Sequence, residues 1–184
     1  GDKVKLKVTE LQELLEKGVH WAVKQGYGSK EDTLKLEENG CMKLADPSLV
    51  SKKAIERGLP QIGSLGSGNH FIEISKIDKI FDEKTAQAFG LNPDNVVVLI
   101  HSGSRGLGHQ IASDYIKKME DTYGFSHLPD RELICAPLHS DLGQQYYQAM
   151  CAGINYAFVN RHMMMQWTRD VFSKVFNGKL DLVY

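Results

Sequence analysis

The 184-residue sequence lacks several features that would assign it to particular protein classes. No apolar run approaches the roughly 20 residues of a membrane-spanning helix, and the amino terminus has no signal-peptide core. The three cysteines, Cys41, Cys135 and Cys151, lie far apart without a C-x-x-C pair, which argues against a zinc knuckle or a disulfide scaffold. We therefore expect a cytoplasmic protein that does not associate with membranes.

The sequence also lacks a charge excess of either sign. It has 22 basic and 23 acidic residues, for a formal net charge of -1. Proteins that capture nucleic acid non-specifically at long range usually carry a basic excess. Any contact with nucleic acid should therefore be local, made by a few arginines and lysines in a cleft. The length fits one globular domain or one half of a larger one.

Polar side chains with strong chemistry follow a glycine-rich run in residues 63–74. If residues 71–74 form a strand, alternation places His70 on one face, and Asn69 and Glu73 on the other. Histidine can offer a neutral nitrogen to a metal, asparagine and glutamate can hydrogen-bond a ligand, and glycines let a backbone approach a phosphate. The alternative is a glycine-rich turn that feeds an ordinary strand.

A second stretch of similar design occupies residues 96–109. The run of β-branched and apolar residues from 96 to 100 predicts a strand buried on both faces. This strand ends on His101, and a glycine and serine loop with Arg105 follows. A strand, a histidine and glycines thus occur together twice, which suggests a metal beside a phosphate.

The remaining periodicity predicts helices before, between and after the strands, and hence an α+β fold with mixed-sheet strands and surrounding helices. A helix is expected from residue 108 to about residue 123, with free amides at its start that favour anions. A long helix is expected over residues 141–176, broken by Asn177 and Gly178. Residues 180–184 are expected to form a strand.

The motifs of these two stretches resemble the two central signatures of the RtcB family, the manganese- and GTP-dependent RNA-splicing ligases. Two flanking motifs are also similar to that family, and the similarity runs in order over essentially the whole chain. The matching motifs are Gly66-x-Gly68-Asn69-His70-Phe71-x-Glu73, His101-Ser102-Gly103-Ser104-Arg105-Gly106-x-Gly108-His109-Gln110, Lys53-Ala54-x-x-Arg57-Gly58-Leu59-Pro60-Gln61 and Asn155-Tyr156-Ala157-x-x-Asn160-Arg161.

The resemblance implies an RNA ligase with the RtcB-type fold. Such an enzyme joins RNA ends bearing a 2',3'-cyclic phosphate or 3'-phosphate to 5'-hydroxyl ends, through GTP-dependent guanylylation of a histidine, in tRNA splicing and RNA repair. The implied cofactors are two manganese ions and GTP. The implied partners are RNA, including tRNA halves, and a flanking chain or an activating protein.

The resemblance also gives roles to six residues. His70 and His101 match two metal-binding histidines. Of the nucleotide contacts, Glu73 matches the acceptor for the guanine edge and Asn69 lies nearer the phosphates. Arg57, at the end of a predicted helix, could simply complement the helix dipole. The residues that match contacts to RNA phosphates are Arg57 and Arg105.

Part of the family's active site has no match in this sequence. The aspartate-glycine-cysteine metal motif of the family precedes the region that matches Gly1, and the third metal histidine and the guanylylated histidine follow the region that matches Tyr184. Residues 1–184 are therefore expected to be one central segment of the catalytic domain, with no catalytic nucleophile. The alternatives are a non-catalytic metal- or nucleotide-binding module that kept His70 and His101, and a structural subunit whose glycine loops only turn corners.

Overall fold

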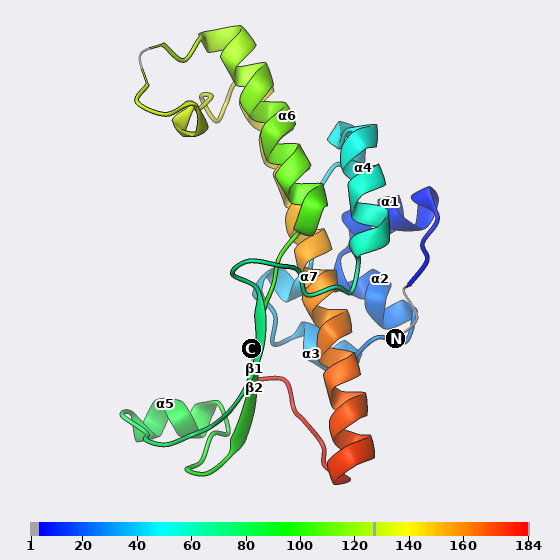
Figure 1. The fold of residues 1–184 in the computed structure, drawn as a ribbon, viewed down its shortest axis with the longest axis vertical. Helices are drawn as coiled ribbons and strands as arrows, with labels where there is room; N and C mark the ends of the chain where they lie inside the picture. The colour runs from blue at the N-terminus through cyan, green and yellow to red at the C-terminus, as the bar shows by residue number, and fades with distance from the viewer. Residues whose placement is uncertain (1–3, 127, 184) are drawn as a thin grey trace.

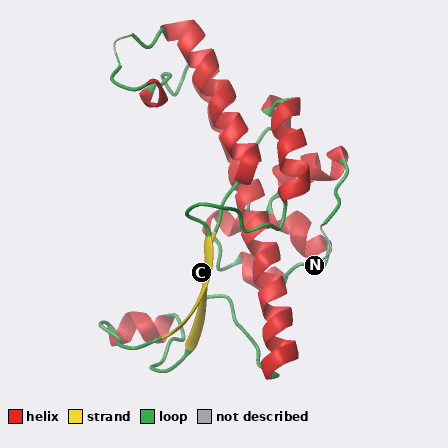
Figure 2. Cartoon of the chain, viewed as in Figure 1, coloured by secondary structure: helices red, strands yellow, loops and turns green. Residues whose placement is uncertain are grey.

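The computed structural model describes residues 4–126 and 128–183. The helix α7 runs along most of the molecule, with α1, α2 and α4 on one side and a two-stranded hairpin on the other (Figure 1). Helix predominates, and the strands are confined to one narrow ribbon (Figure 2). The α-helices are α1 Val8–Lys17, α2 Val19–Lys24, α3 Lys30–Thr33, α4 Lys52–Gly58, α5 Glu83–Ala88, α6 Arg105–Tyr123 and α7 Asp141–Phe176; the strands are β1 Phe71–Lys76 and β2 Val96–His101; and the 3-10 helices are η1 Glu37–Gly40, η2 Pro47–Leu49, η3 Leu59–Gln61 and η4 Arg131–Leu133.

The long helix α7 has the bounds that the sequence predicts. It begins after Ser140, whose hydroxyl oxygen accepts the Gly143 N–H at 3.1 Å, and it ends at Asn177 in a left-handed conformation. Neither α7 nor any other helix of the described ranges is both long and apolar enough to cross a bilayer. The residues of α7 that share its core-facing stripe are Ala149, Ala152, Tyr156, Val159 and Met163.

The hydrophobic core lies between α7, the amino-terminal helices and α6. Side chains spaced three or four residues apart on α1 and α6 form apolar stripes that pack against α7. The fully or almost fully buried side chains of these stripes are Leu11, Leu14, Leu15, Leu107, Ile111, Tyr115 and Met119. Helices α1 and α2 are therefore buried largely by α7, whereas α4 packs on α6.

Helix α6 begins at Arg105, three residues earlier than the sequence predicts. Two glycines in its first turn disfavour a helix locally. The reason for the early start is tertiary: the side-chain oxygen of Gln61 accepts the Gly106 N–H at 2.7 Å. The Gln61 side chain thus bonds one amide at the start of α6, where the sequence predicted free amides that favour an anion.

Strands β1 and β2 pair antiparallel, from Phe71 opposite His101 to Lys76 opposite Val96. The α+β class is confirmed, but the predicted burial of the second strand on both faces is wrong. Leu99 is 56 % exposed and Ile74 of β1 is 63 % exposed, and the sheet in the described ranges has only these two strands. The strand predicted at the carboxyl end is also absent over residues 180–183, and Tyr184 lies outside the described residues.

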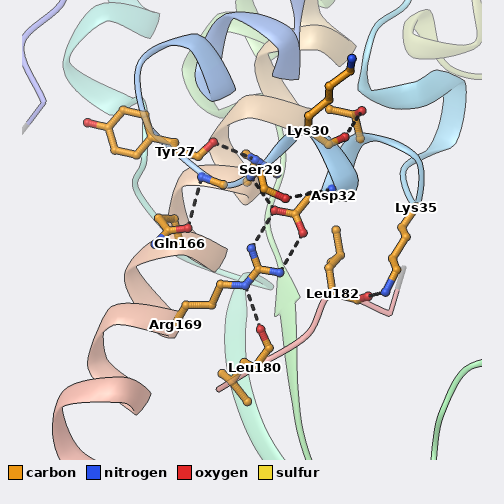
Figure 3. Close-up of polar contacts among 12 residues, drawn as sticks. Tyr27, Ser29, Lys30, Asp32, Lys35, Gln166, Arg169, Leu180 and Leu182 are labelled. Carbon is orange, nitrogen blue, oxygen red and sulfur yellow. Dashed lines mark hydrogen bonds and ion pairs between the residues drawn. The ribbon is translucent and has the colours of Figure 1, made fainter. Parts of the chain in front are cut away.

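A buried ion pair ties the carboxyl-terminal residues to the helical body (Figure 3). The Asp32 carboxylate of α3 accepts hydrogen bonds from both terminal nitrogens of Arg169 on α7, at 2.7 and 2.8 Å. The Nε of Arg169 donates to the Leu180 carbonyl at 2.9 Å, and Lys35 donates to the Leu182 carbonyl. The segment after α7 is thereby held against α3 and α7.

Candidate functional site

Two loops meet at the start of α6. Residues 63–70, the first loop, lead into β1, and residues 102–104, the second loop, connect β2 to α6. The Ser102 hydroxyl donates to the Leu65 carbonyl at 2.7 Å, and the Arg105 Nε donates to the Ser64 hydroxyl at 3.3 Å. The two stretches that the sequence singles out are therefore side by side in the fold.

The structure brings the two predicted metal histidines together. His101 is the last residue of β2 and lies opposite Phe71, with the two rings stacked at a centroid distance of 5.1 Å. His70 immediately precedes β1, so the strand's alternation does not fix its direction. The centroids of the His70 and His101 rings are 6.4 Å apart, a spacing that lets both imidazoles face the same small volume.

The hydrogen bond of His70 suits it to bind a metal. Its Nδ1 lies 3.0 Å from the Ser67 carbonyl oxygen. A carbonyl oxygen only accepts, so Nδ1 of the neutral ring carries the proton and Nε2 keeps its lone pair. Such a bond from the other ring nitrogen orients metal-binding histidines in proteins. The neutral tautomer therefore offers Nε2 as a ligand.

Arg105 and His70 pack against the same glycine of the first loop. A Cβ atom on Gly66 would overlap the Arg105 Nη1 atom and would lie 2.6 Å from the His70 Nδ1. Gly66 also has a φ of +111°, which side-chain-bearing residues rarely adopt. Only glycine at this position lets the guanidinium and the imidazole approach the loop backbone this closely.

Arg57 lies at the same end of α6. Its Nη1 donates to the side-chain oxygen of Gln110 at 2.9 Å and lies 3.3 Å from the His109 Nδ1, which must accept because arginine only donates. The Arg57 Nε is 3.2 Å from the position that a Cβ of Gly106 would take. Arg57 is exposed, so part of its guanidinium remains available to an anion.

The two predicted nucleotide-binding residues are exposed at the edge of this region. Asn69 lies in the first loop, before the strand begins. Glu73 is within β1, opposite Leu99, and shares the face of the ribbon that carries Phe71 and His101. Its carboxylate accepts a hydrogen bond from the Ser75 hydroxyl at 2.6 Å. Both side chains are open to a ligand.

A complete metal site is absent from the part of the chain that the structure describes. No group of three or more histidine, cysteine, aspartate or glutamate residues there could hold a metal ion. His70 and His101 offer two nitrogen donors, whereas manganese favours six-coordinate sites. A metal bound here would need ligands from outside the described residues.

The comparison with known proteins shows to which family this chain is related. The family model described as tRNA-splicing ligase RtcB matches residues 1–184. The chain belongs to the RtcB family. Curated relatives named tRNA-splicing ligase RtcB include one from Methanococcus maripaludis, which is 50 % identical over 194 residues that cover 100 % of this chain and 40 % of the relative.

Two further relatives carry the same name. The one from Methanocaldococcus jannaschii is 54 % identical over 96 % of this chain and 19 % of its own length. The one from Pyrobaculum aerophilum is 49 % identical over 98 % of this chain and 39 % of its own length. The chain thus spans 40 % or less of these RtcB relatives.

One buried residue of the RtcB motifs has a part in the site that the sequence did not reveal. Asn160 of α7 is fully buried, and its side-chain amide contacts both the first and the second loop. Sequence reasoning included it in a matching motif without a role. The available signal was a polar residue that follows the apolar run Ala157-Phe158-Val159 in a helix, because a buried polar residue needs hydrogen-bond partners.

Proposed function

We propose that residues 1–184 supply part of the active site of an RNA ligase. The enzyme would join RNA ends that carry a 2',3'-cyclic phosphate or a 3'-phosphate to 5'-hydroxyl ends, through GTP-dependent guanylylation, in tRNA splicing and RNA repair. The observation that carries the proposal is the convergence of His70, His101 and Arg105 where the two loops meet. Membership of the RtcB family, whose curated relatives are named as tRNA-splicing ligases, supports it.

His70 and His101 are proposed as manganese ligands. The neutral tautomer of His70 leaves Nε2 free. His101 is the last residue of β2 and is exposed. When bound, manganese ions would neutralise phosphate charge and activate the attacking groups. The complete site is proposed to hold two ions, with the remaining ligands and the guanylylated histidine outside residues 1–184.

The remaining candidates are proposed to bind the substrates. Arg57 and Arg105 flank the start of α6 and would hold RNA phosphates, because a guanidinium can bind two phosphate oxygens at once. Asn69 and Glu73 would contact GTP, with the Glu73 carboxylate toward the guanine edge. The RNA substrates would include tRNA halves in the cytoplasm, and a further proposed partner is an activating protein.

The test is a ligation assay on the complete protein that contains these residues. With manganese and GTP, it should join an RNA ending in a 2',3'-cyclic phosphate to an RNA with a 5'-hydroxyl. Residues 1–184 alone should not, because they offer too few ligands. Failure of the complete protein would refute the proposed reaction. Joining by residues 1–184 alone would refute the proposal that the site is shared with flanking sequence.

A pair of glycine variants tests the geometry of the site. Gly66→Ala should weaken manganese binding by about 10-fold or more, because its Cβ would displace Arg105 or His70. Gly68→Ala is the matched control: its φ of +73° imposes similar backbone strain, but a Cβ there meets no atom within 4 Å. Titration of each variant with manganese measures the difference, and equal affinities would contradict this role of Gly66.

A further inference from the structure

The side-chain amide of Asn160 is fully buried where the two loops meet. Its oxygen accepts the backbone N–H of Ser64 in the first loop at 3.0 Å. Its nitrogen lies 3.1 Å from the Ser64 carbonyl, 3.2 Å from the Ser102 hydroxyl and 3.1 Å from the Gly103 carbonyl. One amide group of α7 therefore bonds the backbone of both loops.

The contacts around Asn160 form a closed set. The Ser102 hydroxyl, which lies beside the Asn160 amide, donates its own hydrogen to the Leu65 carbonyl of the first loop. The next residue of α7, Arg161, donates to the Ser102 carbonyl at 3.0 Å. The first loop, the second loop and α7 are thus joined pairwise by hydrogen bonds, so that none can shift alone without breaking one of them.

These contacts lie close to the two histidines. His101 directly precedes Ser102, and His70 ends the first loop six residues after Ser64. Strands β1 and β2 alone cannot hold the two histidines firmly in place, because a two-stranded ribbon is marginally stable in water and this one is exposed. Helix α7 is anchored in the core. A buried amide on that helix can hold the loops at a fixed separation.

We propose that Asn160 is a positioning residue that holds the two loops together and thereby fixes the spacing of His70 and His101 at the manganese site. This inference rests on the proposed function of the two histidines. The amide is suited to the task because it offers an acceptor and two donors in one plane. Aspartate at this position would place carboxylate oxygens against the carbonyls of Ser64 and Gly103 and would repel them.

The same helix offers a matched control in Asn155. Its side chain is as fully buried, and it bonds the backbone of the amino-terminal half: it donates to Leu15 at 2.8 Å and accepts from Met42 at 2.7 Å. None of these partners belongs to the two loops. Loss of Asn155 should therefore destabilise the fold in a similar way without moving the histidines.

The experiment compares Asn160→Ala, Asn155→Ala and His70→Ala in the complete protein, by manganese titration and thermal unfolding. Asn160→Ala should weaken manganese binding about 10- to 100-fold, the range for residues that orient metal ligands. Asn155→Ala should lower the unfolding temperature and keep the manganese affinity. If Asn160→Ala does not fold, Ser102→Ala, which removes the hydroxyl between the loops, should weaken manganese binding in its place.

The outcomes separate the two proposals. If Asn160→Ala binds manganese as tightly as the unsubstituted protein while His70→Ala does not, the positioning role is overturned and the metal site stands. An equal loss of affinity in Asn160→Ala and Asn155→Ala would also overturn it, since the effect would then be general destabilisation. If His70→Ala keeps full affinity, His70 is not a manganese ligand and the inference falls with its proposed role.

Discussion

Alanine at either His70 or His101 should lower the manganese affinity of the complete protein by more than about 100-fold. Substitution of residues that merely orient a metal ligand typically costs 10- to 100-fold, and loss of the ligand itself should cost more. The two rings lie close together, with centroids 6.4 Å apart, and His70 already has the hydrogen bond that directs its free nitrogen. Titration with manganese, followed by electron paramagnetic resonance of the free ion, measures the affinity.

The control for this prediction is another histidine outside the site. His20 lies on the exposed side of α2, and His20→Ala should leave the manganese affinity unchanged. If both His70→Ala and His101→Ala also bind normally, the glycine loops only turn the chain, and the structural alternative replaces the metal site. A loss in only one of the two variants would mean that the other histidine is not a ligand.

The second large effect concerns the Asp32–Arg169 ion pair, for which Asp32→Ala should lower the free energy of unfolding by about 3–5 kcal/mol. This is the usual cost of removing one partner of a buried ion pair and leaving the other charge uncompensated. The side chains of Asp32 and Arg169 are only 7 % and 20 % exposed. Urea unfolding at neutral pH measures the loss.

An exposed ion pair provides the control. The Lys76 Nζ lies 3.0 Å from the Asp94 Oδ1, and the two side chains are 62 % and 80 % exposed. Lys76→Ala should cost only about 0–1 kcal/mol, as removal of a partner from an exposed pair does. A similar cost for Asp32→Ala and Lys76→Ala would contradict the idea that burial makes the Asp32–Arg169 pair important.

The contribution of Asp32 should depend on pH. Burial by itself raises the pKa of its carboxyl, but the hydrogen bonds from Arg169 and from the Ser29 backbone outweigh burial and hold the pKa below its ordinary value. The stabilisation is therefore complete above the unfolded-state pKa of about 3.9 and is lost as the pH falls through the folded-state pKa. The stability difference between the unsubstituted protein and Asp32→Asn should narrow as the pH falls below the unfolded-state pKa of about 3.9, and a difference independent of pH would contradict this.

Local signals were sufficient for the long helix of this fold. Helix α7 could be predicted with its bounds because Ser140 caps its start, the left-handed Asn177 ends it, and no proline interrupts it. The early start of α6 could not be predicted, since it depends on a hydrogen bond that the Gly106 N–H donates to the Gln61 side chain. A hydrogen bond to a residue 45 positions away leaves no trace in local periodicity.

The strands and the site could be predicted from the sequence only in part. Apolar residues in β2 predict a strand, but their composition does not say what covers them, and in the structure Leu99 is exposed. His70 and His101 could be named because they match long motifs of the RtcB family. The part played by Asn160 could not be named, because a buried amide in a helix requires partners but does not identify them.

The packing of α1 against α7 also bears on how the protein is made. The Asn155 side chain donates to the Leu15 carbonyl across 140 positions of sequence, and the apolar stripe of α1 is buried by the same late helix. At about 5–20 residues per second, the ribosome needs roughly 7 to 28 s to add the intervening residues. Throughout that interval the leucines of α1 have no α7 to pack against, so the nascent chain exposes an apolar segment that chaperones can bind, and this core cannot close until α7 has been synthesised.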